Sequence, residues 1–118
     1  MPKKTHWQES VEDWNMTYST DVTAVYFSTV AFLLLLQAAP KERSSSVIAI
    51  SSMSSLMRNA QAHFAYNTAK GATAHLRKMM SKEFVSASIR VNSIAPDYFL
   101  NGMTRKGAIG GIRRMCQR

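Results

Sequence analysis

The chain has 118 residues, which is enough for one small domain and too few for two. Its 15 lysines and arginines outnumber its 7 acidic residues, so the formal net charge is +8. The single cysteine, Cys116, excludes a disulfide framework and a cysteine-based metal site, and the three histidines lack metal-ligand spacing with any acidic residue. Residues 1–7 lack the apolar core of a secretory signal, and we expect a protein of a reducing compartment, the cytoplasm.

A long amphipathic helix is predicted near the N-terminus. Ser10 and Asp13 have the spacing of a capping box, in which each side chain bonds to the backbone N–H of the other residue. Apolar side chains then recur at steps of three and four over residues 14–36, and Pro40 ends the helix because proline lacks a backbone N–H. Residues 30–36 raise the alternative of a membrane span. A membrane-spanning helix needs about 20 mostly apolar residues, and polar residues interrupt the stretch around residues 30–36 before it reaches that length. A buried helix is therefore predicted.

The following elements alternate between strand and helix. Residues 47–51 are short, apolar and β-branched, which is typical of a strand covered on both faces in a parallel sheet. Helical periodicity returns from about residue 63 to residue 86, and residues 89–94 read as a second strand. The alanines that would let another helix approach this second helix closely are Ala65, Ala69 and Ala72. The order helix, strand, helix, strand predicts parallel pairing and an α/β layer architecture.

The second helix carries a tyrosine and a lysine on one face. Tyr66 and Lys70 are four residues apart, which places their Cβ atoms about 5–6 Å from each other. A positive charge beside the Tyr66 hydroxyl favours the phenolate, which can take a proton from an alcohol or return one to a carbonyl. Ser52, at the end of the first strand, is placed to hydrogen-bond the same substrate oxygen. Without these neighbouring elements, a packed tyrosine beside a solvated lysine would be the better interpretation.

Together these elements resemble the C-terminal half of a short-chain dehydrogenase/reductase domain, from about residue 9 to residue 104. The resemblance rests on a serine at the end of an apolar strand, then Tyr-x-x-x-Lys, then Ile-Arg-Val-Asn-Ser-Ile-Ala-Pro at residues 89–96. The amino-acid sequences of residues 63–72 and 78–84 are similar to those of fungal members of the family. The resemblance implies a partial Rossmann-like, three-layer parallel sheet that lacks its N-terminal βαβ half.

The resemblance also implies an activity, which is hydride transfer between NAD or NADP and a small-molecule alcohol or ketone. Tyr66 would be the acid/base, Lys70 would favour its ionised form, and Ser52 would orient the substrate oxygen. Ser51 is the alternative for the serine role. The residues implied to contact the cofactor are Tyr66, Lys70, Pro96 and Thr104. Family members pair their two long helices between subunits, so a homo-oligomer is expected.

The chain departs from the family pattern in ways that support a second hypothesis. No strand leads into the glycine-rich turn that receives the pyrophosphate, and Gly107–Gly111 follows no strand. Asp21 stands where relatives place an asparagine, and its carboxylate near Lys70 would offset part of the charge that favours the phenolate. Asp97 replaces a usual glycine. The alternative is therefore a truncated, catalytically inactive fragment that only pairs with other subunits of the family.

The last fourteen residues differ in composition from the rest of the chain. Residues 105–118 hold five basic side chains and no acidic one. Such a segment is compatible with contacts to nucleic acid or anionic lipid, but no aromatic platform or nucleic-acid motif accompanies the charge. The sequence therefore predicts a domain over residues 1–104 and a basic, poorly ordered tail over residues 105–118, with neither a nucleic acid nor a membrane as partner.

Overall fold

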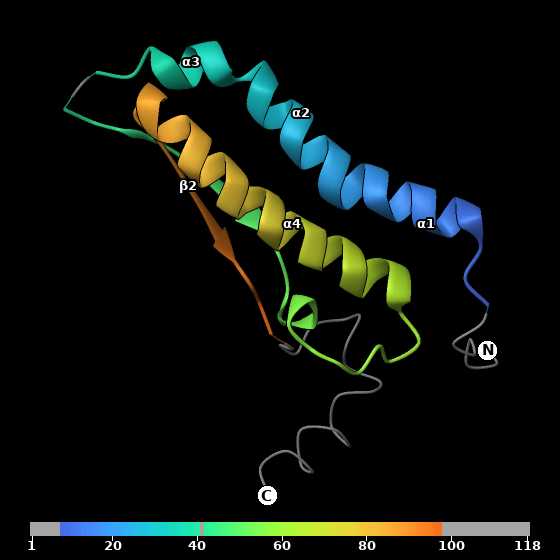
Figure 1. Ribbon diagram of the computed structural model, residues 1–118. Coiled ribbons are helices and arrows are strands. Elements are labelled where there is room, and N and C mark those ends of the chain that lie inside the picture. The colour runs from blue at the N-terminus through green and yellow to red at the C-terminus, as the bar shows by residue number, and fades with distance from the viewer. Residues whose placement is uncertain (1–7, 41, 98–118) are drawn as a thin grey trace, which may run out of the picture.

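The structure, a computed structural model, describes residues 8–40 and 42–97. The elements in chain order are α1 (Val11–Tyr18), a π-helical turn η1 (Ser19–Thr23), α2 (Ala24–Ala31), α3 (Leu33–Gln37), β1 (Ser45–Ile50), a 3₁₀ turn η2 (Met53–Ser55), α4 (Phe64–Glu83), a 3₁₀ turn η3 (Phe84–Ala87) and β2 (Ile89–Ile94). Figure 1 shows α1, α2 and α3 following one another as a bent rod beside α4, with the two strands behind α4. This order confirms the predicted alternation of helix and strand.

The two strands pair in parallel, as predicted. Their register runs from Ser45 opposite Ile89 to Ile50 opposite Ile94. Side chains alternate between the faces of a strand, and Ile89 and Val91 are buried on the face toward the helices, where Met80 of α4 packs with them.

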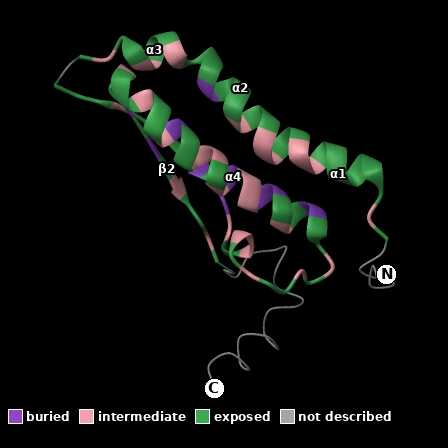
Figure 2. Ribbon diagram, in the orientation of Figure 1, coloured by how far each residue is buried: buried purple, intermediate pink, exposed green. Residues whose placement is uncertain are grey.

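The opposite face of the sheet is exposed. The side chains of Ile48, Ile50 and Ile94 lie open to solvent. Figure 2 shows buried residues mainly on α4 and on the strands. Within residues 8–40 and 42–97, helices therefore cover only one side of the sheet. The described part of the chain forms two layers of the expected three-layer architecture.

The first helical segment begins as predicted and is then interrupted twice. The capping box is present, with the Ser10 side chain accepting from the Asp13 backbone N–H and the Asp13 carboxylate accepting from the Ser10 backbone N–H. The π-helical turn Ser19–Thr23 widens the helix after α1. A second break falls at Phe32, whose φ of −90° and ψ of 1° leave the α-helical range between α2 and α3.

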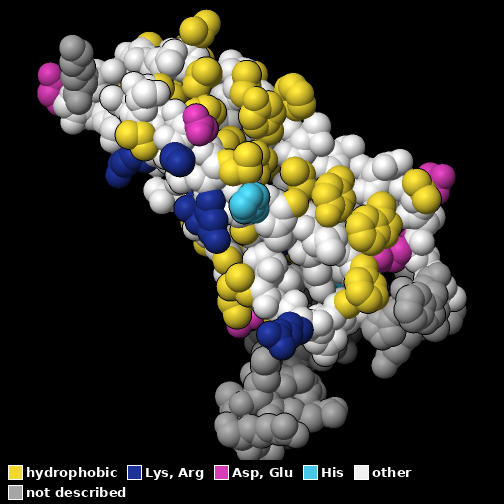
Figure 3. All heavy atoms as spheres, viewed as in Figure 1, with side chains coloured by type: hydrophobic (Ala, Val, Ile, Leu, Met, Phe, Trp, Pro, Cys, Tyr) yellow, Lys and Arg dark blue, Asp and Glu magenta, His cyan; other side chains and the backbone are white. Residues whose placement is uncertain are grey.

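The prediction that residues 30–36 form a buried helix is wrong for the chain as the structure describes it. Leu34 and Leu35 are 81% and 70% exposed, while Leu33 and Leu36 reach the small core. Figure 3 shows hydrophobic side chains gathered along α2 and α3. The reason is geometric, because the two strands of residues 42–97 offer too little surface to cover every apolar side of this segment. None of the described helices combines the length and apolarity needed to cross a membrane.

The helix α4 presents a face of small residues to α1 and η1. Ala65, Ala69 and Thr73 are buried at successive four-residue steps, and the Thr73 hydroxyl donates to the backbone oxygen of Asp21 at 2.6 Å. Small side chains allow the two helical segments to lie close together, as the alanines predict. That contact is made within one chain.

Some expectations lie outside the described residues. These are the cofactor contact at Thr104, the basic tail over residues 105–118 and the boundary between that tail and the domain. The division of the chain at residue 104 stays a prediction.

Candidate active site

The candidate site lies where the end of β1 meets the first turns of α4. The chain leaves β1 at Ile50, and Lys70 reaches back to that point, donating from Nζ to the Ile50 backbone oxygen at 3.1 Å. The hydroxyl of Ser51 donates to the Lys70 backbone oxygen at 3.1 Å. These two bonds join residues about twenty positions apart in sequence, and they fix the lysine over the end of the strand.

The two serines after β1 have different surroundings. Ser51 is buried, and its hydroxyl is engaged with the backbone of α4. Ser52 is half-buried, and its oxygen accepts from the Ser54 backbone N–H at 3.1 Å, as the N-cap of η2. The Ser52 hydroxyl hydrogen remains able to donate to a ligand, because capping uses the oxygen as an acceptor. The geometry therefore favours Ser52 over Ser51 as a contact for a substrate oxygen.

Tyr66 and Lys70 lie together, as their spacing predicts. The Lys70 Nζ atom is 5.6 Å from the centroid of the Tyr66 ring, within the range of a cation–π contact. The two differ in exposure, since Lys70 is buried and Tyr66 is 41% exposed. The Tyr66 hydroxyl forms no hydrogen bond with any of the described residues.

Asp21 forms a direct ion pair with the lysine. Its Oδ1 atom is 3.1 Å from the Lys70 Nζ atom. Asp21 reaches this position from the π-helical turn η1, and the bond from Thr73 to its backbone oxygen holds that turn against α4. The expectation that Asp21 lies near Lys70 is therefore confirmed. The pair partly cancels the lysine's charge, and Lys70 then has a carboxylate and a backbone oxygen as partners.

The segment after β2 returns to the same end of the sheet. The Met53 backbone N–H donates to the Pro96 backbone oxygen at 3.1 Å, which places Pro96 beside the start of η2. Ser52, Lys70 and Pro96 thus lie at the carboxyl end of the two parallel strands, where ligands of open α/β sheets bind. In the part of the chain that the structure describes, no three histidine, cysteine, aspartate or glutamate side chains come together as a metal site.

One residue near the site was missed by the sequence reasoning. The carboxylate of Glu9 accepts from the Ala65 backbone N–H, with distances of 3.3 and 3.2 Å to its two oxygens. The two residues are 56 positions apart. No local pattern signals this contact, since it depends on how α1 and α4 lie relative to each other.

Comparison with known proteins identifies the family. The family model described as short chain dehydrogenase matches residues 2–108. The chain belongs to the short-chain dehydrogenase family. A solved member, described as a Pseudomonas aeruginosa RhlG/NADP active-site complex, is 32% identical with a TM-score of 0.81, covering 90% of this chain and 42% of that one. The expected fold, a partial Rossmann-like domain, is thereby confirmed.

Curated relatives of the short-chain dehydrogenase family include fungal proteins, as expected from the sequence. The short-chain dehydrogenase/reductase PhomF' of Diaporthe leptostromiformis is 33% identical over an alignment of 102 residues, and the match covers 83% of this chain and 35% of that protein. The sorbose reductase SOU1 of Candida albicans is 38% identical over an alignment of 95 residues, and the match covers 78% of this chain and 32% of that protein. The chain spans about a third of the length of these curated relatives.

Proposed function

We propose that this chain carries the catalytic half of an NAD(P)-dependent oxidoreductase, in which Tyr66 is the acid/base for an alcohol or ketone. The observation that carries the proposal is the contact between the ring of Tyr66, an exposed residue, and the ammonium of the buried Lys70 at the carboxyl end of parallel strands. A phenol in this place can exchange a proton with a substrate oxygen, and in this proposal Ser52 hydrogen-bonds that same oxygen.

The described residues fit one side of a dinucleotide. An ammonium group has three N–H donors, and the Ile50 oxygen and the Asp21 carboxylate take two of those on Lys70. The third is available for a ribose hydroxyl, with Tyr66 and Pro96 at the same end of the sheet. When bound, the nicotinamide would supply or accept the hydride. The sequence offers no glycine-rich turn for the pyrophosphate, so these residues would hold only the nicotinamide side of the dinucleotide.

A chimeric enzyme tests this function with sorbose, the substrate named for the Candida albicans relative. The matched segment of the Candida albicans sorbose reductase is replaced by residues 8–97 of this chain, and sorbose reduction is followed by the loss of reduced nicotinamide absorbance. We expect activity in the chimera and a loss of about 100-fold or more in Tyr66→Phe, the range that general acid–base catalysis supplies.

The matched control is Tyr26→Phe, which changes a tyrosine on α2 outside the site. It is expected to leave the chimera as active as its parent. Equal activity of the Tyr66→Phe and Tyr26→Phe chimeras would refute the assignment of the acid/base.

A second candidate function is assembly without catalysis, as a subunit fragment that pairs with members of the same family. It is favoured by the apolar side chains that α2 and α3 leave exposed, among them Phe27, Leu34 and Leu35. An apolar surface of this kind marks an interaction site or an aggregation hazard. The same surface would serve a homo-oligomer built through the long helices.

Sedimentation velocity tests the assembly function. The chain is run alone and then mixed with a full-length relative, and the expected result is a faster component that contains both proteins. A double substitution, Leu34→Lys with Leu35→Glu, is expected to abolish that component, because charged side chains are costly to bury in an apolar contact. Unchanged sedimentation of the mixture would argue against pairing.

A further inference from the structure

We propose that Glu9 is a positioning residue that caps α4 from outside the helix and so fixes the turn that carries Tyr66. Both carboxylate oxygens face the Ala65 backbone N–H, at 3.3 and 3.2 Å. Ala65 is 4% exposed, so water cannot easily replace this acceptor. Its N–H is one of the first-turn groups that a helix leaves without an internal partner.

No side chain at the N-cap or in the first turn of α4 caps the helix. Its N-cap is His63, which makes no side-chain capping bond, and its first turn contains no acidic residue. The first backbone bond of the helix runs from the Asn67 N–H to the His63 oxygen. A carboxylate supplied from elsewhere therefore satisfies a buried donor, and it also meets the positive end of the helix dipole.

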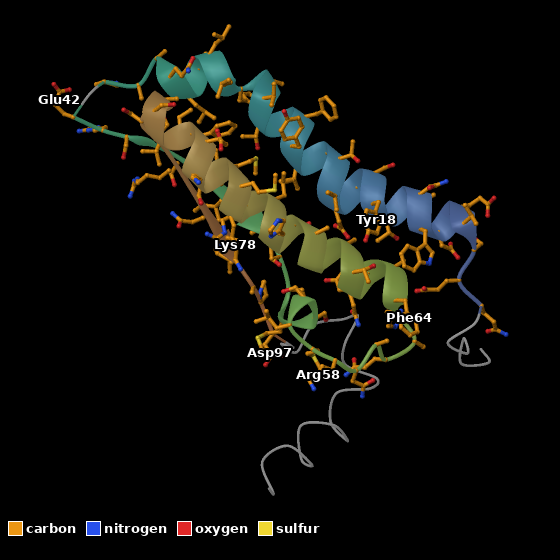
Figure 4. All side chains as sticks on the ribbon, in the orientation of Figure 1. Tyr18, Glu42, Arg58, Phe64, Lys78 and Asp97 are labelled. Atoms are coloured by element: carbon orange, nitrogen blue, oxygen red, sulfur yellow. The ribbon has the colours of Figure 1, made fainter. Side chains whose placement is uncertain are left out.

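Two successive residues cap two different helices. Glu9 accepts from α4, and the next residue, Ser10, accepts from the Asp13 N–H at the start of α1. The first turns of the two helices are thereby joined. Figure 4 shows Phe64, the first residue of α4, at the end of the helix that lies near the start of α1. The cap thus sets the position of α4 relative to α1 as well as satisfying one donor.

The consequence for the site follows from the position of the capped residue. Ala65 directly precedes Tyr66, and the Asn67 side chain donates to the Ala60 oxygen of the preceding loop at 3.0 Å. The residue before Tyr66 is thus hydrogen-bonded to Glu9, next to α1, and the residue after it is hydrogen-bonded to the preceding loop. That this placement serves proton transfer rests on the proposed function, whereas the cap itself does not.

Hydrogen exchange of the backbone amides tests the cap directly in the chain itself. In Glu9→Ala we expect the Ala65 amide to exchange about fivefold faster or more, the effect of losing a helix cap. Amides in the middle of α4, such as that of Leu76, should change less than about twofold. Glu9→Gln keeps an acceptor oxygen without the charge, so it should restore part of the protection and stays informative if the alanine variant does not fold.

The matched control is Glu42→Gln, which removes the same charge. Glu42 lies at the opposite end of the molecule from Phe64 (Figure 4), so the Ala65 amide should keep its parental rate. A uniform change along α4, or an unchanged Ala65 rate in Glu9→Ala, would overturn the proposal. In the sorbose reductase chimera, Glu9→Ala should lower kcat with little change in KM. If exchange responds as expected and kcat does not, the cap stands and its link to catalysis is refuted.

Discussion

Replacing Lys70 by methionine should expose how strongly the ion pair with Asp21 holds the site together. Unit charges 3.1 Å apart attract each other by about 5 kcal/mol at an effective dielectric constant of about 20, before desolvation is subtracted. Breaking a buried pair by removing one partner costs about 3–5 kcal/mol. The Lys70 and Asp21 side chains are still 11% and 19% exposed, so we expect a loss of about 2–3 kcal/mol in the free energy of unfolding.

The assay is urea unfolding followed by far-UV circular dichroism, on Lys70→Met, Asp21→Asn and the double variant. A coupling energy of about 1–2 kcal/mol between the two substitutions is expected, because each single variant leaves one charge without its partner. Lys78→Met is the matched control, since Lys78 lies exposed on the same helix (Figure 4) and should change stability by less than about 0.5 kcal/mol. Additive effects of the two site substitutions would refute the reasoning.

Three further outcomes are expected. Thr73→Val should destabilise the chain by about 1–2 kcal/mol in the same unfolding assay, because it leaves the backbone oxygen of Asp21 without the Thr73 donor. In the chimera, Ser52→Ala should lower kcat about tenfold or more, whereas Ser51→Ala, which removes only a bond to the Lys70 backbone, should chiefly lower stability; the reverse pattern would reassign the serine role. Isothermal calorimetry of the chain by itself should detect no saturable NADPH binding, since no glycine-rich turn is present for the pyrophosphate, and micromolar affinity at one site would contradict this.

The sequence was sufficient for features that depend on near neighbours. The capping box of Ser10 and Asp13 was predictable because both bonds span three residues. The second strand was expected at residues 89–94, and β2 has those bounds. The proximity of Tyr66 and Lys70 followed from the four-residue spacing, which puts two side chains on one helix face in any fold.

The burial of the predicted first helix could not be derived from local sequence patterns. Its apolar periodicity was real, but periodicity does not say how much surface the rest of the fold can cover. Leu34 and Leu35 stay exposed because the described sheet has only two strands. The π-helical turn Ser19–Thr23 likewise contacts a distant segment, since its Asp21 backbone oxygen accepts from Thr73 of α4.

The sequence by itself determined the order of elements, the parallel sheet and the pairing of Tyr66 with Lys70. Only the tertiary structure showed that the Ser51 hydroxyl bonds to the backbone of α4, and only it brought Glu9 to the start of that helix, 56 positions away. The physical reason is the range of the interactions. Spacing along a helix or strand fixes contacts among near neighbours, whereas the contact of Glu9 with Ala65 exists only after α1 and α4 have packed against each other.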